Sequence, residues 1–384
     1  MNNHSPAQGL VNATVMAALL LCAAHAHAGP NDRQQQQRHS QKQGSRHVDI
    51  VLALDTSSSM DGLIDAARQK LWDVVSLMSK AQPQPILRVG VISYGNTAYD
   101  GKAGWVRKDI DLTTDLDTVY GKLFSLSTSG GDEYVARAVK VATEDMLWSQ
   151  EADTLRIVFV AGNESAEQDP AVTLKTALDG ARGRGIFVNA IYCGSEGAAD
   201  ATSWVRLASL GKGRFAAVDQ NRAVAIATPQ DEELRGLSES LNKTYVAYGH
   251  DGMAKAANQV AQDRNAAASA PMAASRAVGK SSALYNAEEW DLVDATKAKK
   301  KDLKTMPAAE LPATMRAMPA EKRAEFVEQK SQERDAIKHR IEAVSAQREK
   351  YIAAQRKNAA AGASVDDALL GGIKSEAESS GFKF

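Results

Sequence analysis

The segment His47–Met60, with the sequence HVDIVLALDTSSSM, constrains the fold more than any other part of the chain. A run of Val, Ile, Leu and Ala residues that ends in small polar residues is typical of a buried strand in a parallel sheet. Ligands of such folds bind at the carboxyl ends of the strands. Asp55, Ser57 and Ser59 therefore offer three oxygen-bearing side chains from one loop, and oxygen ligands suit a hard cation such as Mg²⁺.

The same loop has a second interpretation. Ser57, Ser59 or Asp61 can cap a helix that begins near Gly62, because short polar side chains accept hydrogen bonds from the first unpaired backbone N–H groups of a helix. Metal binding and helix capping both remain open for this segment taken alone.

Strand and helix patterns alternate after this segment. Buried strands are predicted over 87–94, 154–161, 186–192 and 213–218, and helices over 62–79, 115–124, 133–148, 170–184 and around 204–210. The alternating polarity of 106–112 indicates an edge strand. A last helix, marked by Leu234, Leu237, Leu241 and Tyr245, is expected to pack back on the sheet. The pattern predicts an α/β domain over 47–248, with a mostly parallel sheet and helices on both faces.

Several of these segments resemble one known family. The Asp55-x-Ser57-x-Ser59 motif, the turn at Gly130-Gly131, the segment IVFVAGNESAEQDP and the later VNAIYCG are similar to von Willebrand factor A-type domains, in particular a bacterial exported subgroup. The resemblance covers most of 47–248. It implies a Rossmann-like fold and a metal-ion-dependent adhesion site that holds Mg²⁺ or another divalent cation.

The resemblance also marks where this chain departs from the family. The second metal loop of the family offers a threonine, and Asp132 stands near that place here. The third loop offers an aspartate, and here Asn163 replaces it, with Glu164 just beyond. The metal ligands implied are therefore Asp55, Ser57, Ser59, Asp132 and Glu164. A degenerate site with only a structural role is the alternative.

The amino terminus has the pattern of an export signal. An apolar stretch over 11–24 precedes Ala26-His27-Ala28, which predicts a signal peptide over 1–28 that is cleaved before Gly29. The polar stretch 29–46 is expected to be a disordered leader. The mature protein is then periplasmic or secreted, with no later transmembrane segment. Removal of Cys22 leaves Cys193 alone, and we expect it to be a buried, unreactive thiol.

The remainder of the chain is predicted to be helical. Residues 249–283 are rich in Ala and are expected to form a loosely packed helix and a linker, followed by a helical region over 284–384. The aromatic segment Leu284–Val293 is expected to pack on the preceding domain. A long helix is predicted from Ala320 to about Lys357, and the heptad spacing of Ile337, Val344 and Tyr351 suggests a coiled coil.

The sequence offers little catalytic chemistry. None of its seven histidines lies between His47 and His250, so the strand-end loops hold no imidazole base. Phosphate-binding loops, dinucleotide fingerprints and H-E-x-x-H motifs are also missing from the sequence. The remaining enzymatic interpretation is a metal-dependent hydrolase that uses Asp55, Asp132 and Glu164.

These observations favour a non-catalytic exported module that binds a protein partner, whose carboxylate completes the coordination of the metal. A scaffold that interacts through its helical tail, with a vestigial metal site, is the alternative. The net charge of −1 does not favour binding to nucleic acid, and the Lys297–Lys304 run is expected to be a solvated helix face.

Overall fold

The computed structural model describes residues 46–218, 226–358 and 365–384. The predicted signal peptide, and the predicted leader except for Arg46, lie outside the described residues.

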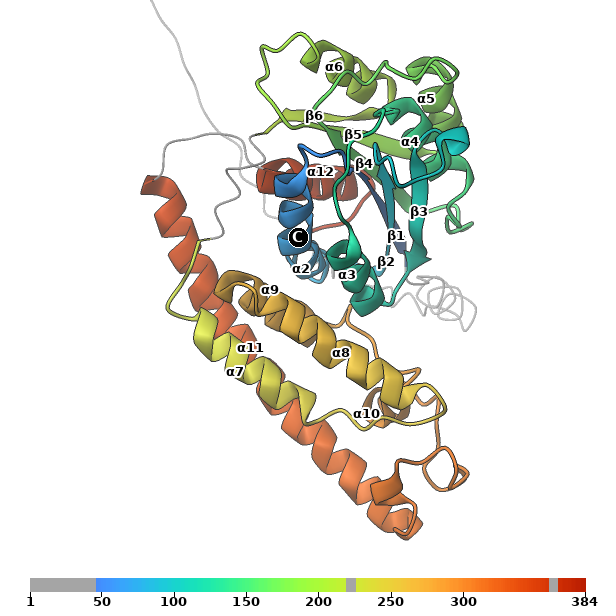
Figure 1. The fold of residues 1–384 in the computed structure, drawn as a ribbon. Coiled ribbons are helices and arrows are strands. Elements are labelled where there is room, and N and C mark those ends of the chain that lie inside the picture. Colours follow the sequence, from blue (N-terminus) through green and yellow to red (C-terminus); the bar gives the residue numbers. More distant parts are fainter. Residues whose placement is uncertain (1–45, 219–225, 359–364) are drawn as a thin grey trace, which may run out of the picture. The chain divides into compact units, whose positions relative to one another are not determined.

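A six-stranded sheet forms the centre of the amino-terminal part of the chain, in the order β3-β2-β1-β4-β5-β6 (Figure 1). The strands are β1 (His47–Asp55), β2 (Ile86–Tyr94), β3 (Val106–Thr113), β4 (Leu155–Gly162), β5 (Ile186–Tyr192) and β6 (Lys212–Ala217). All neighbours pair in parallel except β2 and β3, which are antiparallel. The predicted α/β fold with a mostly parallel sheet is confirmed, and the predicted edge strand is β3.

Helices cover both faces of this sheet and bury one apolar core on each side. One core contains residues from α2 (Asp61–Met78) and α3 (Leu116–Ser125). The other contains residues from α4 (Val135–Glu144), α5 (Leu174–Gly183) and α6 (Ala201–Leu210). Strands β1 and β4 are buried on both sides, which explains why their sequences are almost continuously apolar.

Two helices are shorter than the sequence pattern predicts. Helix α5 begins at Leu174 and not at Pro170, because Thr173 is its N-cap and accepts a hydrogen bond from the backbone N–H of Thr176. Helix α4 ends at Glu144, and the indole of Trp148 donates back to the carbonyl of Ala142 at 2.9 Å. Met146 and Trp148 therefore belong to a packed loop, whereas Leu147 between them is exposed.

The helix predicted to close the sheet does not do so. Helix α7 (Asp231–Asn242) packs through Leu234 and Leu241 against α9 (Ala270–Ser281) and α11 (Ala320–Asn358). The sheet is covered instead by α12 (Val365–Ser379), which comes from the far end of the chain (Figure 1). An apolar stripe shows that a helix is packed, but not which surface it packs against.

Helix α12 joins the same core as α2. Leu369, Ile373 and Ala377 are buried there together with Phe159 of β4. The last residues continue this packing: Phe382 is 2% exposed, with the guanidinium of Arg46 4.4 Å from the centre of its ring. The carboxyl-terminal segment is thus part of the α/β core.

One carboxyl group of α12 itself is buried, on the side of the helix that faces the sheet. Glu376 is 6% exposed, and neither of its oxygens receives a well-formed hydrogen bond from a described residue. Burial raises the pKa of Glu376 to about 7, against the weaker opposing effects of Asn189 and Arg214 on the neighbouring strands. The protonated form of Glu376 therefore fits this contact better than the charged form.

The segment 249–283 contains two packed helices, where a loosely packed helix and a linker were predicted. It forms α8 (Gly252–Ala266) and α9, which are joined by a short turn capped by Ser269. The small residues of α9 permit close packing, since a Cβ atom added to Gly279 would lie 2.4 Å from the ring of Trp72 in α2. The Ala-rich composition therefore serves tight helix packing.

Helices α7, α8, α9 and α11 pack on one another and form a helical arm. The aromatic segment after α9 packs on this arm as well as on the α/β core. Tyr245, after α7, stacks on Trp290 with ring centroids 5.4 Å apart, and Tyr285 contacts Trp72.

The remaining elements are η1 (Gly101–Ala103), α10 (Leu292–Lys297) and η3 (Ala313–Met315). Three lysines of the basic run form ion pairs: Lys297 with Asp335, Lys300 with Glu288, and Lys301 with Glu310.

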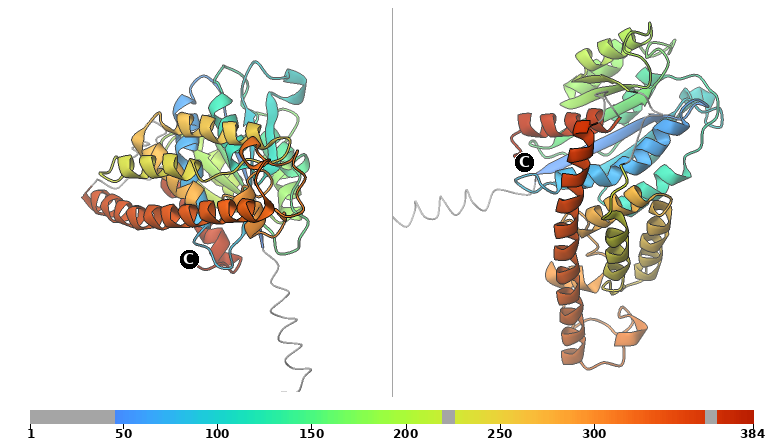
Figure 2. Two further views of the ribbon diagram at one scale, coloured as in Figure 1. Left: turned by 90° about the horizontal axis from the view of Figure 1, so that it is seen from below. Right: turned by 90° about the vertical axis from the view of Figure 1, so that its left-hand side faces the viewer.

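Helix α11 is a single continuous helix that runs beside α7 and α9 (Figure 2). Ile341 and Val344 are fully buried against these two helices, and Ile337 is packed beside them. The stripe that suggests a coiled coil is therefore used within the chain itself. No helix in the described ranges is long and apolar enough to cross a membrane.

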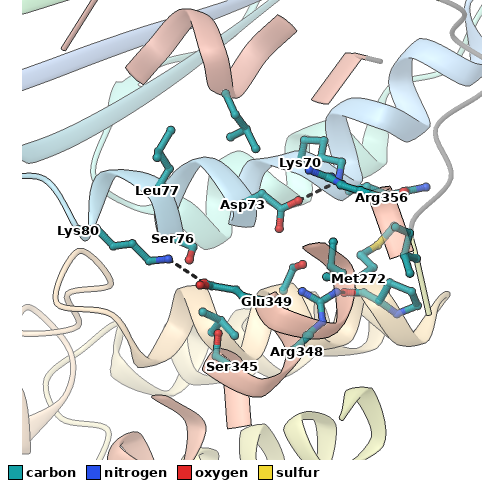
Figure 3. Close-up of a pocket in the computed structure, with 17 residues that line it drawn as sticks. Lys70, Asp73, Ser76, Leu77, Lys80, Met272, Ser345, Arg348, Glu349 and Arg356 are labelled. Atoms are coloured by element: carbon teal, nitrogen blue, oxygen red, sulfur yellow. Dashed lines mark hydrogen bonds and ion pairs between the residues drawn. The ribbon is translucent and has the colours of Figure 1, made fainter. Parts of the chain in front are cut away.

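A cavity of about 240 Å³ lies where α2 faces α9, α11 and α12 (Figure 3). Lys80 of α2 donates to Glu349 of α11 at 2.7 Å, and Lys70 donates to Asp73 at 2.8 Å (Figure 3). Arg348 is paired with Asp231. Since these charges compensate one another, we interpret the cavity as a polar gap between packed helices and not as a binding site.

Candidate metal centre

Three loops meet at the carboxyl ends of the central strands. The loop after β1 is joined to the end of β2 by the hydrogen bond from the Thr56 N–H to the Tyr94 carbonyl, at 2.8 Å. It is joined to the loop before α4 by the bond from the Ser129 N–H to the Thr56 carbonyl, at 3.0 Å. Because β1, β2 and β4 are parallel neighbours, the loop after β4 ends at the same edge.

The first loop has the geometry that the sequence motif predicts. Asp55 is fully buried, and its Oδ1 accepts a hydrogen bond from the Ser57 N–H at 2.7 Å. The hydroxyl oxygens of Ser57 and Ser59 are 3.4 Å apart. From the third loop, the amide Nδ2 of Asn163 donates to the Ser59 hydroxyl at 3.0 Å. One carboxylate, two hydroxyls and one amide are thus brought together.

The capping interpretation of this loop is wrong. The N-cap residue of α2 is Met60, and no side chain caps that end of the helix. Asp61 instead accepts a hydrogen bond from the Thr128 hydroxyl at 2.7 Å. Ser57 and Ser59 are therefore not used to begin the helix.

Glu133 is the carboxylate that sequence reasoning missed. It is 4% exposed and lies within hydrogen-bonding reach of both Asp55 and Ser57. Gly95 makes room for this contact, since a Cβ atom there would lie 2.8 Å from Oδ1 of Asp55 and 3.1 Å from Cγ of Glu133. The sequence places Asp132 and Glu133 side by side, and only the course of the turn decides which of them faces inward.

Burial raises the pKa of both carboxyl groups. Burial is the largest cause of the raised pKa of Asp55, and it raises the pKa of Glu133 further, with the adjacent Asp55 carboxyl adding to the effect. Two carboxylates in a buried position repel each other unless a proton or a cation lies between them. A proton or a cation bound between the two carboxyl groups would therefore stabilise the pair.

The carboxylates of Asp132 and Glu164 are hydrogen-bonded elsewhere, although the charge of Glu164 still raises the pKa of both buried carboxyls. Asp132 is exposed, and its Oδ2 accepts hydrogen bonds from the Trp105 indole at 3.3 Å and the Tyr134 hydroxyl at 3.2 Å. Glu164 is also exposed, and its carboxylate accepts from the Gln168 amide at 2.6 Å. Of the five predicted ligands, the structure brings together Asp55, Ser57 and Ser59.

The donor set fits a hard divalent cation. When Asp55 is ionised, its buried Oδ2 accepts no hydrogen bond from the N–H and O–H groups of the described residues, and the same is true of Oδ1 of Asn163. Such buried oxygen atoms are costly unless a cation or water satisfies them. The described part of the chain contains no group of three or more His, Cys, Asp and Glu residues placed to hold a metal. Any cation here must rely on hydroxyl, amide and water oxygens beside Asp55 and Glu133.

The groups beneath the site do not add a nucleophile or a base. The hydroxyl of Tyr94 donates to the Ala161 carbonyl at 2.8 Å, and burial raises the pKa of Tyr94 well above its usual value. Cys193 is a free, buried thiol, and burial raises its pKa to about 12. The thiol is therefore protonated, and its predicted burial is confirmed.

Comparison with known proteins agrees with this arrangement. Residues 49–232 match the model of the von Willebrand factor type A domain. No curated protein matches the sequence.

Similar solved structures include proximal thread matrix protein 1 from the mussel byssus, with a zinc-occupied MIDAS motif, at 15% identity and a TM-score of 0.37. They also include the pilus adhesin SpaC from Lactobacillus rhamnosus GG, at 15% identity and a TM-score of 0.35, and a von Willebrand factor type A protein from Catenulispora acidiphila, at 13% and 0.35. The matches cover 47%, 45% and 46% of this chain, and 43%, 28% and 39% of the other chains, respectively. The chain thus spans less than half of the length of these proteins.

Proposed function

We propose that this protein, whose residues 49–232 match the model of the von Willebrand factor type A domain, is an exported, non-catalytic module that binds a protein partner at the strand-end edge of its sheet. The observation that carries the proposal is the buried pair of Asp55 and Glu133, which faces the hydroxyls of Ser57 and Ser59 at that edge. The export signal predicted over 1–28 supports the proposed location outside the cytoplasm.

Asp55, Ser57, Ser59 and Glu133 would hold a divalent cation, Mg²⁺ being the best match to these ligands. When bound, the cation supplies a positive centre to which a carboxylate of the partner can attach. Asp55 and Glu133 provide the charge that retains it, and Asn163 orients the Ser59 hydroxyl. Because two carboxylates already balance a divalent charge, we expect attraction for the partner's carboxylate to be modest.

A hydrolase is less well supported by the same geometry. Asp132 and Glu164, which would serve as additional acid or base groups, are exposed and hydrogen-bonded elsewhere. Both buried carboxyls are used in the proposed cation site. The arrangement offers a place to bind and no positioned group to activate water.

The proposed function is tested by capturing partners from the cell envelope with the purified full-length protein. We expect specific capture in Mg²⁺ and its loss both in EDTA and with Asp55→Ala. Asp179→Ala, which removes an exposed carboxylate of α5, is the matched control and should capture normally. Equal capture by all variants, with and without EDTA, would contradict the proposal and favour a scaffold that binds through the helical arm.

A further inference from the structure

Trp105 is held in an unusual backbone conformation next to the candidate metal centre. Its φ is 57°, in the left-handed region that residues with side chains rarely adopt, and it follows Gly104 with a φ of 75°. Two backbone hydrogen bonds maintain this turn: the Trp105 N–H donates to the Asp100 carbonyl at 3.2 Å, and the Gly95 N–H donates to the Trp105 carbonyl at 3.1 Å. Outliers of this kind collect at functional sites.

The indole of Trp105 is ordered although it is half-exposed. It packs on the backbone of Gly101 in η1, where a Cβ atom would lie 2.9 Å from its ring. Its N–H donates to Oδ2 of Asp132, which also accepts from the Tyr134 hydroxyl. Two aromatic side chains thus present one exposed carboxylate between them.

Asp132 has no basic partner in the described part of the chain. Two arginines close by in the sequence are already used: Arg107 lies over Tyr99 and is paired with Asp109, and Arg137 makes a bidentate pair with Asp169 at 2.8 Å. The second oxygen of the Asp132 carboxylate is therefore open to a cation from outside. Exposed carboxylates beside aromatic rings attract ammonium and guanidinium groups through both charge and cation–π contacts.

This surface adjoins the metal centre directly. Glu133 follows Asp132 in the chain, and the Gly95 that bonds to Trp105 is the residue packed against Asp55. We propose that Trp105, Asp132 and Tyr134 form a subsite for a basic side chain, Lys or Arg, of the protein partner. This inference rests on the proposed function. It predicts that the partner carries a basic residue close to the acidic residue that is directed at the cation.

The subsite is tested by NMR on the full-length protein labelled with ¹⁵N, in EDTA so that no divalent cation takes part. The indole resonance of Trp105 is assigned among the five tryptophans by its loss in Trp105→Phe. We expect N-acetyl-arginine amide or N-acetyl-lysine amide to shift this resonance in a saturable manner. N-acetyl-norleucine amide, at equal ionic strength, is the uncharged control and should not shift it.

Asp132→Asn keeps an acceptor for both aromatic donors but removes the charge, so we expect the saturable shift to disappear in this variant. Asp179→Asn, which neutralises a distant exposed carboxylate, should respond like the wild type. The proposal is overturned if both basic probes leave the resonance unmoved, or if Asp132→Asn responds as the wild type does. Since EDTA is present throughout, either result is independent of whether the metal centre binds a cation.

Discussion

Replacing Arg276 by methionine is expected to lower the free energy of unfolding by about 3–5 kcal/mol, because the change leaves buried carboxylates without their partner. Arg276 of α9 is 1% exposed, and its Nη1 is 2.8 Å from Oδ1 of Asp117 in α3. Its Nε is paired with Asp263 of α8, and its Nη2 donates to the Gln259 carbonyl at 2.9 Å. This one side chain therefore connects the α/β core to the helices of the arm.

The surroundings of Arg276 explain why the loss should be large. Its guanidinium lies 4.7 Å from the centre of the Trp72 ring, so it is held by a cation–π contact as well as by charge. Although burial favours the neutral form, the charges of Arg276 and Lys280 hold the pKa of Asp263 below its usual value. Asp117 depends on the same guanidinium. Without it, buried negative charge would remain at Asp117 in the α/β core and at Asp263 in the helical arm.

The matched control is Arg206→Met, which removes an arginine from the exposed pair with Glu167. Exposed pairs contribute about 0–1 kcal/mol, so this variant should unfold almost as the wild type does. Urea denaturation monitored by circular dichroism measures both values. If the two variants lose similar stability, the buried network around Arg276 does not hold the α/β core and the helical arm together.

Deleting residues 365–384 is expected to prevent stable folding of the α/β domain. The deletion removes Leu369, Ile373 and Phe382, each of which is at most 6% exposed. Full burial of such side chains contributes about 1.5–3 kcal/mol each, so roughly 5–9 kcal/mol is lost against a typical total of about 5–15 kcal/mol. A fragment that ends near residue 248 should fail for the same reason.

Two milder changes keep this prediction testable if the truncated protein is insoluble. Phe382→Ala should cost about 3–5 kcal/mol, whereas Phe384→Ala, at a position that is 41% exposed, should cost little. A soluble, cooperative 46–248 fragment, or equal effects of the two Phe substitutions, would show that α12 is not part of the core.

The same contact should respond to pH through Glu376. Because the folded-state pKa is raised to about 7, its stabilising contribution is complete below the usual glutamate pKa and is lost as the pH rises through about 7. The loss can reach about 3 kcal/mol. Glu376→Gln should therefore be more stable than the wild type at pH 8 and similar to it at pH 4.5. Denaturation at both values measures the difference.

The sequence predicted the sheet well because its evidence is local. Each buried strand is a continuous apolar run, and the Asp55 loop follows the first of them directly. The preference for right-handed crossovers between parallel strands then restricts the possible topologies. None of these steps requires knowledge of distant contacts.

The errors concern contacts that local patterns do not encode. The stripe of α7 is compatible with any apolar surface, and it packs on α9 and α11 because α12 already covers the sheet. Glu133 was missed because Asp132 and Glu133 have the same chemistry and differ only in the direction of a turn. That direction is set by the close approach of Gly131 to the Gly95 carbonyl, which no sequence pattern reports.

The central claim is that Asp55 and Glu133, with Ser57 and Ser59, hold one divalent cation. Its most direct test is titration of the purified apoprotein with Mn²⁺, with free Mn²⁺ measured by electron paramagnetic resonance. We predict one saturable Mn²⁺ per chain for the wild type and for Asp132→Asn, and none for folded Asp55→Ala or Glu133→Ala. No saturable Mn²⁺ in the wild type, or binding retained by Glu133→Ala but lost by Asp132→Asn, would contradict the account.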